Sequence, residues 1–310
     1  MDKKVLKLLK SKQYKQKSDD WYSERKNLIT ASSAANVLKK DDKTCDSYIN
    51  TYDLHDTFDK NGKCCNPYSS KEQYIAEKCK QQTSFKGNMA TYWGQKYEPV
   101  ALSLYSKTTG KEILDFGLIK HDSIKWLGAS PDGITKDGVM VEIKCPFRRK
   151  ITGIPPFYYW IQVQIQLEVC DLEYCDFAEY EFMEFDSEEE FFDNTKKGLY
   201  SGVFIKIESS NSIDDPSELL YVYPDSEFRD YTTKQMIEWK NRFIEEKTND
   251  STCLSPVYWK VIDMSVVRIK RDREWFNNIF KDLEEAYYTI LDYRKNGIPT
   301  SIKKPKTCIF

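Results

Sequence analysis

The sequence has 310 residues, of which 40% are hydrophobic and 31% are charged, and its formal net charge is -2. This composition is typical of a soluble globular protein with one large domain or two small ones. No apolar run approaches the length of a membrane span, and the apolar part of the N-terminal segment is too short for a secretory signal. We therefore expect a protein that is not secreted and that stays in a cytosol-like compartment.

The number and spacing of the cysteines and histidines limit the kinds of metal site and catalytic site that the chain can form. The nine cysteines include no CxxC pair, and His55 and His121 are the only histidines. Both facts argue against structural zinc and against a catalytic histidine, and reduced thiols are the simpler expectation. If the chain is an enzyme, we expect its chemistry to rest on carboxylates, lysine and a metal ion.

Charge is segregated along the chain. Residues 1–17 carry seven Lys and one Asp, residues 144–150 carry four cations and no anion, and residues 171–193 carry eleven acids and no cation. A nearly neutral protein with this pattern can still present a basic groove. For the acidic run we favour a solvated face.

The N-terminal part of the chain predicts helices around a long loop. Residues 1–20 form a basic N-terminal arm, for which a frayed, solvated helix is favoured over a DNA-contacting arm. Residues 41–70 are polar and rich in turn-forming residues, which predicts a long loop or insertion. Helical spacing covers 70–79 and 90–110, and the second helix is expected to end at Gly110. Its predicted buried face consists of Tyr97, Val100, Ala101, Leu104 and Tyr105.

Strand-like alternation dominates the rest of the chain. Strands are predicted at 112–120, 123–129, 138–144 and 174–185, and further alternating segments at 202–209, 219–224 and 256–272. Helices are predicted at 155–170, entered through Pro155 and Pro156, and at 231–247 and 273–296, the last ending at Gly297. This order predicts an α/β fold with a central mixed β-sheet flanked by helices. We expect a single domain over 21–310, with a motif-bearing core at 21–185 and C-terminal strands and helices at 186–310.

The stretch "GASPDGITKDGVMVEIK" at residues 128–144 carries the chemistry. "SPDG" fits a type I turn, and alone it would indicate no more than a β-hairpin. In the strand that follows, Glu142 and Lys144 lie two residues apart and therefore share a face. Burying a lone acid and a lone base is costly unless they are paired or bind something. A short hairpin would also bring Asp132 to the end of this strand, so that two carboxylates and an ammonium converge.

These groups suit the hydrolysis of phosphodiesters. Mg²⁺ prefers oxygen ligands, commonly one or two carboxylates together with water and phosphate. Asp132, Glu142 and the backbone carbonyl of Ile143 could supply them, and the ion would lower the pKa of a bound water. Lys144 would orient or help to deprotonate that water, or stabilise the pentavalent phosphate. The alternative, which we consider weaker, is a structural Glu142–Lys144 pair on a solvated sheet face.

"SPDG" followed by "VEIK" resembles the PD-(D/E)XK nucleases, in particular the branch of phage lambda exonuclease and the YqaJ-type viral recombinases, or alkaline exonucleases. The resemblance implies a restriction-endonuclease-like core. It extends to "WYSERKNLITASSAANVL", which implies that Arg25 and Ser32 bind a DNA phosphate, in this branch the 5′-terminal one. Ser130 would be a further phosphate contact, and Asp115 matches an additional acidic position weakly.

Three later segments extend the resemblance. "WGQKYEPVALSLY" implies that Glu98 is an additional active-site and metal-binding glutamate. "YYWIQVQIQLEV" implies that Gln162 holds the attacking water or a phosphate oxygen, and Gln166 shares its helix face. For this helix, a half-exposed surface with polar Gln residues is the alternative. "KCPFRRK" implies a basic residue near the terminal phosphate, and the choice between Arg149 and Lys150 stays open.

The resemblance implies a Mg²⁺-dependent 5′→3′ exonuclease, with one or two ions and with Mn²⁺ as a substitute, that acts on linear double-stranded DNA. It would leave 3′ single-stranded tails for recombination or viral genome processing, in the cytoplasm or nucleus of a host cell. The alternatives are a structure- or end-dependent endonuclease or resolvase with the same core, and a catalytically silent DNA-binding module. The implied partners are DNA ends and a single-strand annealing or binding protein, with no membrane. A monomer, a dimer and a ring-shaped trimer all stay open.

Overall fold

The computed structural model describes residues 1–39, 41–55, 58, 69–80, 87–195, 200–208, 219–224, 232–247 and 253–299. Its helices are α1 (Lys3–Lys10), α2 (Asp19–Lys26), α3 (Ala31–Ala34), α4 (Asp42–Tyr52), α5 (Lys71–Cys79), α6 (Met89–Thr109), α7 (Phe157–Cys170), α8 (Glu188–Asn194), α9 (Thr233–Lys247) and α10 (Arg273–Asn296). Its strands are β1 (Ile29–Thr30), β2 (Ile113–Leu114), β3 (Ile119–Lys120), β4 (Leu127–Ala129), β5 (Gly133–Thr135), β6 (Val139–Lys144), β7 (Tyr174–Phe185), β8 (Ser201–Glu208), β9 (Leu220–Val222) and β10 (Cys253–Lys270). Within these residues, no helix is long and apolar enough to cross a membrane.

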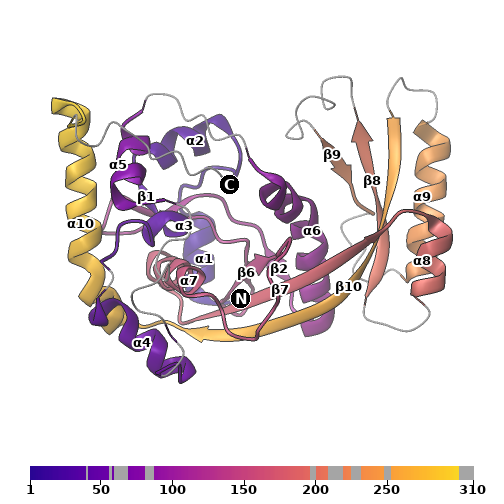
Figure 1. Ribbon diagram of the computed structural model, residues 1–310, viewed down its shortest axis with the longest axis horizontal. Coiled ribbons are helices and arrows are strands. Elements are labelled where there is room, and N and C mark those ends of the chain that lie inside the picture. Colours follow the sequence, from indigo (N-terminus) through magenta and orange to yellow (C-terminus); the bar gives the residue numbers. More distant parts are fainter. Residues whose placement is uncertain are drawn as a thin grey trace.

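The central sheet is mixed, as predicted. Its order is β2-β5-β6-β7-β10-β8-β9, with β6 and β7 parallel and the other neighbours antiparallel. The parallel pair needs a crossover connection, and α7 provides it. A second, three-stranded sheet has the order β1-β4-β3. Figure 1 shows the long ribbons of β7 and β10 running from the body that contains α7 to the part that contains β8, β9, α8 and α9.

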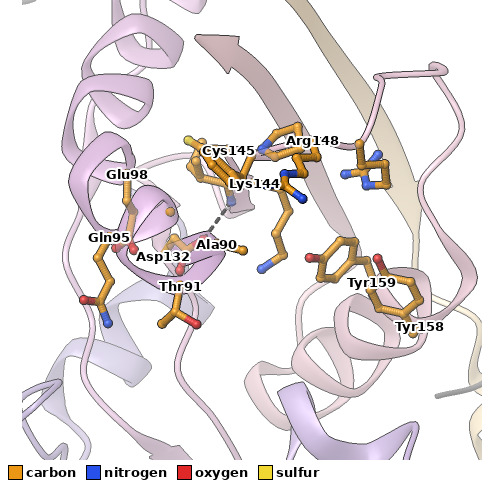
Figure 2. Close-up of a pocket in the computed structure, with 15 residues that line it drawn as sticks. Ala90, Thr91, Gln95, Glu98, Asp132, Lys144, Cys145, Arg148, Tyr158 and Tyr159 are labelled. Atoms are coloured by element: carbon orange, nitrogen blue, oxygen red, sulfur yellow. Dashed lines mark hydrogen bonds between the residues drawn. The ribbon is translucent and has the colours of Figure 1, made fainter. Parts of the chain in front are cut away.

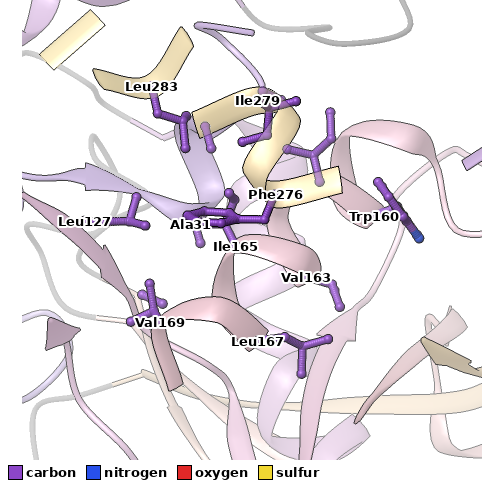
Figure 3. Packing of buried hydrophobic residues seen from close by; sticks show 14 of the residues in the cluster. Ala31, Leu127, Trp160, Val163, Ile165, Leu167, Val169, Phe276, Ile279 and Leu283 are labelled. Carbon is purple, nitrogen blue, oxygen red and sulfur yellow. The ribbon is translucent and has the colours of Figure 1, made fainter. Parts of the chain in front are cut away.

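Helices cover both faces of the central sheet, and each face has its own core. On one face, α6 packs against Val141 and Ile143 of β6, and its predicted buried residues are all buried. On the other face, α7 contributes Trp160, Ile165 and their neighbours to a core that also contains residues of α10 and β4. Figure 3 shows Ile165 of α7 beside Phe276 of α10, with Ile279 and Leu283 further along α10. The predicted α/β fold with a mixed sheet between helices is confirmed.

The helix α7 is buried almost throughout, which overturns the half-exposed alternative for its Gln stripe. Gln162, Gln164 and Gln166 are 9%, 1% and 1% exposed. Gln164 Nε2 donates to the carbonyl oxygen of Lys270 at 2.9 Å, and its Oε1 accepts from the Asp272 N–H at 2.7 Å. Buried amides need such partners, so Gln164 ties α7 to the junction of β10 and α10.

The segment 41–70 was predicted to be a loop, and this is wrong for its first part. The helix α4 starts at its N-cap Asp41, whose side chain accepts from the Thr44 N–H, and it buries Cys45, Tyr48 and Ile49. This apolar stripe is short and lies among polar residues, so the turn-like composition concealed it. Residues 56, 57 and 59–68 lie outside the described part of the chain.

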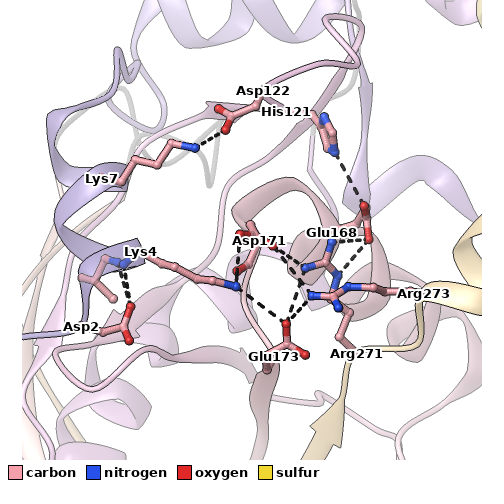
Figure 4. A network of polar contacts seen from close by, with 11 residues as sticks. Asp2, Lys4, Lys7, His121, Asp122, Glu168, Asp171, Glu173, Arg271 and Arg273 are labelled. Carbon is pink, nitrogen blue, oxygen red and sulfur yellow. Dashed lines mark hydrogen bonds and ion pairs between the residues drawn. The ribbon is translucent and has the colours of Figure 1, made fainter.

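The N-terminal helix is docked and not frayed, which corrects a second prediction. Val5 is fully buried and Leu8 nearly so, and Asp2 caps α1 by accepting from the Lys4 N–H at 2.7 Å. Lys4 pairs with Asp171 at 3.1 Å, and Lys7 pairs with Asp122. Figure 4 shows these pairs alongside the network around Arg271. The burial of Val5 and Leu8 therefore docks this helix against the body, and Lys4 and Lys7 add ion pairs at its exposed edge.

Two strand predictions also change. The segment 112–120 forms β2 and β3, which belong to different sheets, and only the end of 123–129 forms a strand, β4. "SPDG" is not the hairpin turn: it is the bend that connects β4 to β5 across the two sheets. The hairpin of β5 and β6 turns at 136–138, where Gly138 adopts φ 89°. A left-handed backbone favours Gly, so "KDG" is the better turn sequence here.

Candidate active site

The carboxylate of Glu142 lies at the centre of a buried polar cluster. Glu142 is 1% exposed. Its Oε1 accepts from Lys144 Nζ and from Gln162 Nε2, both at 2.5 Å, and its Oε2 accepts from Gln166 Nε2 at 2.7 Å. Glu142 and Lys144 thus share a face of β6, as the alternation predicts. The arrangement is no solvated surface pair, because α7 covers it.

Asp132 lies beside the same strand end. It precedes β5, and its Oδ2 accepts from the backbone N–H of Ile143 at 2.7 Å. The pairing of β5 with β6 reaches Gly133 and Val141, so the backbone of Ile143 lies past the last paired residue of β5. The hairpin therefore brings Asp132 to the end of β6, as expected. Residues of "SPDG" and of "VEIK" thus lie together in one site.

The carboxylates of the cluster outnumber its cations. Burial raises the pKa of Asp132 well above its usual value, and the charges of Glu142 and Glu98 raise it further. Burial also raises the pKa of Glu98, against the effects of Lys17 and Lys144. For Lys144, the charges of Glu142 and Asp132 outweigh a lowering by burial, so its pKa lies above its usual value. Carboxylates that raise one another's pKa are stabilised by an added cation.

A cleft of about 460 Å³ opens at this point. Figure 2 shows Glu98 and Gln95 of α6 on one side, Tyr158 and Tyr159 of α7 on the other, and Asp132 and Lys144 between them. The Lys144 Nζ lies 4.7 Å from the centre of the Tyr159 ring. The segment after β6, residues 145–149, completes the wall.

The donor set fits a hard divalent cation. Within the described ranges, no three His, Cys, Asp or Glu side chains already converge as the ligands of an ion. The cleft lining nevertheless includes two carboxylate residues, Glu98 and Asp132, and carboxylate oxygens are ligands that Mg²⁺ prefers. On Glu142, three donors leave one lone pair, on Oε2, for a further bond. Glu142 lies behind the cleft wall and keeps one lone pair free, whereas Asp132 is part of the wall itself.

Three of the residues expected to bind phosphate, namely Arg25, Ser32 and Ser130, lie together around Trp21. The guanidinium of Arg25 lies 4.2 Å from the centre of the Trp21 ring, and Arg25 Nη2 donates to Ser32 Oγ at 3.3 Å. Trp21 Nε1 donates to Ser130 Oγ at 3.0 Å. Since Ser130 is two residues before Asp132, this group adjoins the carboxylates. Burial lowers the pKa of Arg25.

The structure distinguishes the two candidate basic residues after β6. Arg149 lines the cleft and forms an ion pair with Glu179 of β7. Lys150 is exposed and is not part of the cleft wall. Arg149 is therefore the one placed to reach a ligand in the cleft.

Several residues at the site were not assigned a role from the sequence. Gln166 was noted only as a neighbour of Gln162, yet it holds the second oxygen of Glu142. Glu179 is 1% exposed and pairs in register with Lys144 on the neighbouring strand. Lys17 acts on Glu98 from a segment expected to be solvated. Alternation along 174–185 could have placed Glu179 on the same face, but no local signal marks Lys17.

Lys78 of α5 holds the segment that carries Arg25. Its Nζ donates to the carbonyl oxygens of Arg25 at 2.6 Å and Leu28 at 2.9 Å. Arg294 of α10 donates to the carbonyl oxygen of Lys26 at 2.6 Å. Burial, and after it the charges of Arg25 and Arg294, lowers the pKa of Lys78 to about 7.

We expect Lys78 to make the stability of the protein depend on pH. Above about pH 7 the folded protein loses the proton of Lys78, whereas the unfolded chain keeps it up to the ordinary value of 10.5. Because the unfolded chain binds more protons in this window, the free energy of unfolding rises with pH there. Denaturant unfolding of the wild type and Lys78→Met across this window measures the effect. The variant should show a smaller rise, and equal slopes would contradict the lowered pKa.

Comparisons with known proteins show similarity to one family model and to one curated protein. The model of the YqaJ-like viral recombinase domain matches residues 59–173. Uncharacterized protein R354 of Acanthamoeba polyphaga mimivirus is 26% identical over 324 residues, which cover 92% of this chain and 54% of that protein. The chain thus spans about half the length of this curated relative.

Solved structures are similar as well. An alkaline exonuclease (LHK-Exo) from Laribacter hongkongensis has a TM-score of 0.50 at 20% identity, over 90% of this chain and 95% of that one. A phage-related exonuclease from Haemophilus somnus 129PT has a TM-score of 0.45 at 14% identity, over 87% and 96% of the two chains. The likeness to the Laribacter enzyme supports the predicted fold, a mixed sheet flanked by helices.

Proposed function

We propose that the chain, in which residues 59–173 match the model of the YqaJ-like viral recombinase domain, is a metal-dependent DNA exonuclease. It degrades linear double-stranded DNA from the 5′ end and leaves 3′ single-stranded tails. The observation that carries this proposal is the meeting of Asp132, Glu142 and Lys144 at the end of β6, beside the cleft.

The proposed metal site consists of oxygen groups in and beside the cleft. Asp132, Glu142, Glu98 and the carbonyl oxygen of Ile143 would hold one or two Mg²⁺ ions, or Mn²⁺. A strand residue directs its N–H and C=O to the same edge, so the Ile143 carbonyl faces the side on which its N–H meets Asp132. A bound ion would lower the pKa of the attacking water and neutralise charge on the phosphate.

The buried partners of Glu142 support the proposal by fixing its carboxylate. Gln162 and Gln166 each donate to a different oxygen of Glu142, so the group cannot rotate freely. The raised pKa of Lys144 keeps it protonated, which favours its role as a cation that stabilises charge on the phosphate over a role as a base. That Gln162 also holds the water or a phosphate oxygen stays a prediction.

The residues around Trp21 support end recognition. In this proposal, Arg25, Ser32 and Ser130 bind the 5′-terminal phosphate, with Arg25 as a charge-assisted donor. Because Ser130 is joined to Asp132 through Pro131, a terminal phosphate held here would bring the following phosphodiester towards the carboxylates. Arg149, in the cleft wall, would contact the backbone as well.

Three DNA substrates test the proposal against its alternatives. Linear duplex with 5′-phosphate, linear duplex with 5′-hydroxyl and covalently closed circles are each incubated with Mg²⁺ or with chelator. We expect degradation of the phosphorylated ends in Mg²⁺ alone, slower degradation of hydroxyl ends and intact circles. Cutting of circles at the same rate would indicate an endonuclease, and binding without any degradation would indicate a silent module.

The tails would serve recombination or viral genome processing in a host cell. The description of the matched domain as a viral recombinase and the mimivirus relative support this context. The partner of this protein in recombination would be a second protein that binds and anneals single-stranded DNA. To test the role in recombination, two duplexes with matching end sequences are partially digested and then mixed. Products without 3′ tails that anneal to one another would contradict it.

A further inference from the structure

The N-terminal strap, residues 13–18, is fixed against the body next to the active site. Tyr14 forms a β-bridge with Leu118, and Gln13 Oε1 accepts from the Gly117 N–H at 2.9 Å. A Cβ on Gly117 would lie 2.2 Å from the carbonyl oxygen of Tyr14, so only Gly allows this close approach. The strap is therefore a defined part of the fold.

The strap is also hydrogen-bonded to the chain segments that carry two of the acidic residues. Gln16 Nε2 donates to the carbonyl oxygens of Phe116 and Pro131, both at 3.1 Å. Pro131 immediately precedes Asp132, and Phe116 immediately follows Asp115. Gln16 thus ties the strap to the two chain segments that carry these acids.

At its C-terminal end, the strap connects to the residues expected to bind the terminal phosphate. Ser18 caps α2 by accepting from the Trp21 N–H at 3.2 Å, and Trp21 in turn contacts Arg25 and Ser130. Lys17 lies between Gln16 and Ser18. Its backbone is accordingly held between the carboxylate centre and the group around Trp21.

The backbone of Lys17 has an uncommon conformation. Its φ is 65°, in the left-handed region. Among the described residues, the other non-Gly residues with positive φ are Asp53 and Asp171, which end α4 and α7. Asp tolerates this region better than Lys, and Gly best of all. The backbone therefore does not require Lys at this position, and strain of this kind commonly accompanies function.

The side chain of Lys17 carries a charge that no carboxylate of the described residues neutralises by an ion pair. It is exposed. The ammonium is therefore accessible to a ligand, and it belongs to a backbone that the neighbouring Gln16 ties to the segment of Asp132.

We propose that Lys17 is a DNA-binding residue of the active site, whose ammonium contacts a backbone phosphate between the group around Trp21 and the carboxylates. This inference rests on the proposed function, since it takes the nucleotide to be removed as lying between these two places. A lysine on a fixed backbone can follow the phosphate through its flexible stem. Three carboxylates repel DNA, and a cation at this point lowers that repulsion.

Binding and turnover of two variants test the inference. Lys17→Gly and Lys17→Asn remove the charge, and both residues tolerate the backbone conformation. Binding to 5′-phosphorylated duplex is measured in chelator over a series of salt concentrations. Loss of one phosphate contact should weaken binding and reduce the slope of log affinity against log salt by about one. Lys17→Arg should keep the wild-type slope, and kcat/KM in Mg²⁺ should fall for the two neutral variants.

The control is Lys15→Gly, which removes an exposed lysine of the same strap. It should keep both the salt slope and kcat/KM. Thermal stability should be unchanged or higher in Lys17→Gly, because Gly adopts this φ more readily. Wild-type slope and turnover in both neutral variants would overturn the inference and leave the proposed function standing. A wild type that neither binds nor degrades duplex DNA would overturn both.

Discussion

Asp132→Asn is expected to slow DNA degradation severely while it leaves the protein at least as stable as the wild type. The pKa of Asp132 is raised by burial and by the charges of Glu142 and Glu98, so its ionised form is unfavourable in the folded protein. Asn removes that charge and can still accept from the Ile143 N–H. A neutral amide is a poor ligand for a divalent ion, so we expect the degradation rate to fall roughly 10²- to 10⁴-fold.

Two measurements check this prediction together. Thermal unfolding in chelator should give an equal or higher midpoint for Asp132→Asn, and added Mg²⁺ should raise the midpoint of the wild type more than that of the variant. Rates on linear duplex are compared in the same buffer. A variant that unfolds at a much lower temperature would show that Asp132 is structural, and wild-type degradation would remove it from the active site.

Arg25→Met is expected to remove the preference for 5′-phosphorylated ends. Arg25 offers a charge-assisted donor beside Ser32, and the loss of a hydrogen bond to a charged group costs about 1.5–3 kcal/mol. This corresponds to roughly a 10- to 100-fold loss in kcat/KM on phosphorylated ends. Hydroxyl ends lack the bound group, so their degradation should change much less.

The ratio of kcat/KM on phosphorylated and hydroxyl ends is the quantity to measure. Lys281→Met, which removes an exposed cation of α10, is the matched control for a lost charge and should keep the ratio of the wild type. Folding of Arg25→Met is checked by its unfolding midpoint. An equal loss on both kinds of end would contradict the assignment of Arg25 to the terminal phosphate.

The centre of the candidate site could be predicted because its geometry is local. A strand alternates with a period of two, so Glu142 and Lys144 had to share a face. The hairpin is short, so Asp132 had to lie near the strand end. The details of the turn were not predictable in the same way, because "SPDG" and "TKDG" are both good turn sequences and only the pairing of β5 with β6 selects between them.

The surroundings of the site depend on packing between distant segments. The burial of Gln162, Gln164 and Gln166 follows from α7 lying between a sheet and α10, and the sequence of α7 alone does not reveal this. Lys17 was expected in a solvated arm because its neighbours are polar. Bonds from Gln16 to Phe116 and Pro131, about a hundred residues away, fix it instead.

The most direct test of the central claim follows the two ends of one duplex. A linear, 5′-phosphorylated duplex carries different labels at its 5′ and 3′ ends, and the release of each is timed in Mg²⁺, in chelator and with Asp132→Asn. The account predicts that the 5′ label leaves first, as a mononucleotide, only in Mg²⁺ and only with the wild type. Release of the 3′ label first, or equal release in chelator, would contradict a metal-dependent 5′→3′ exonuclease.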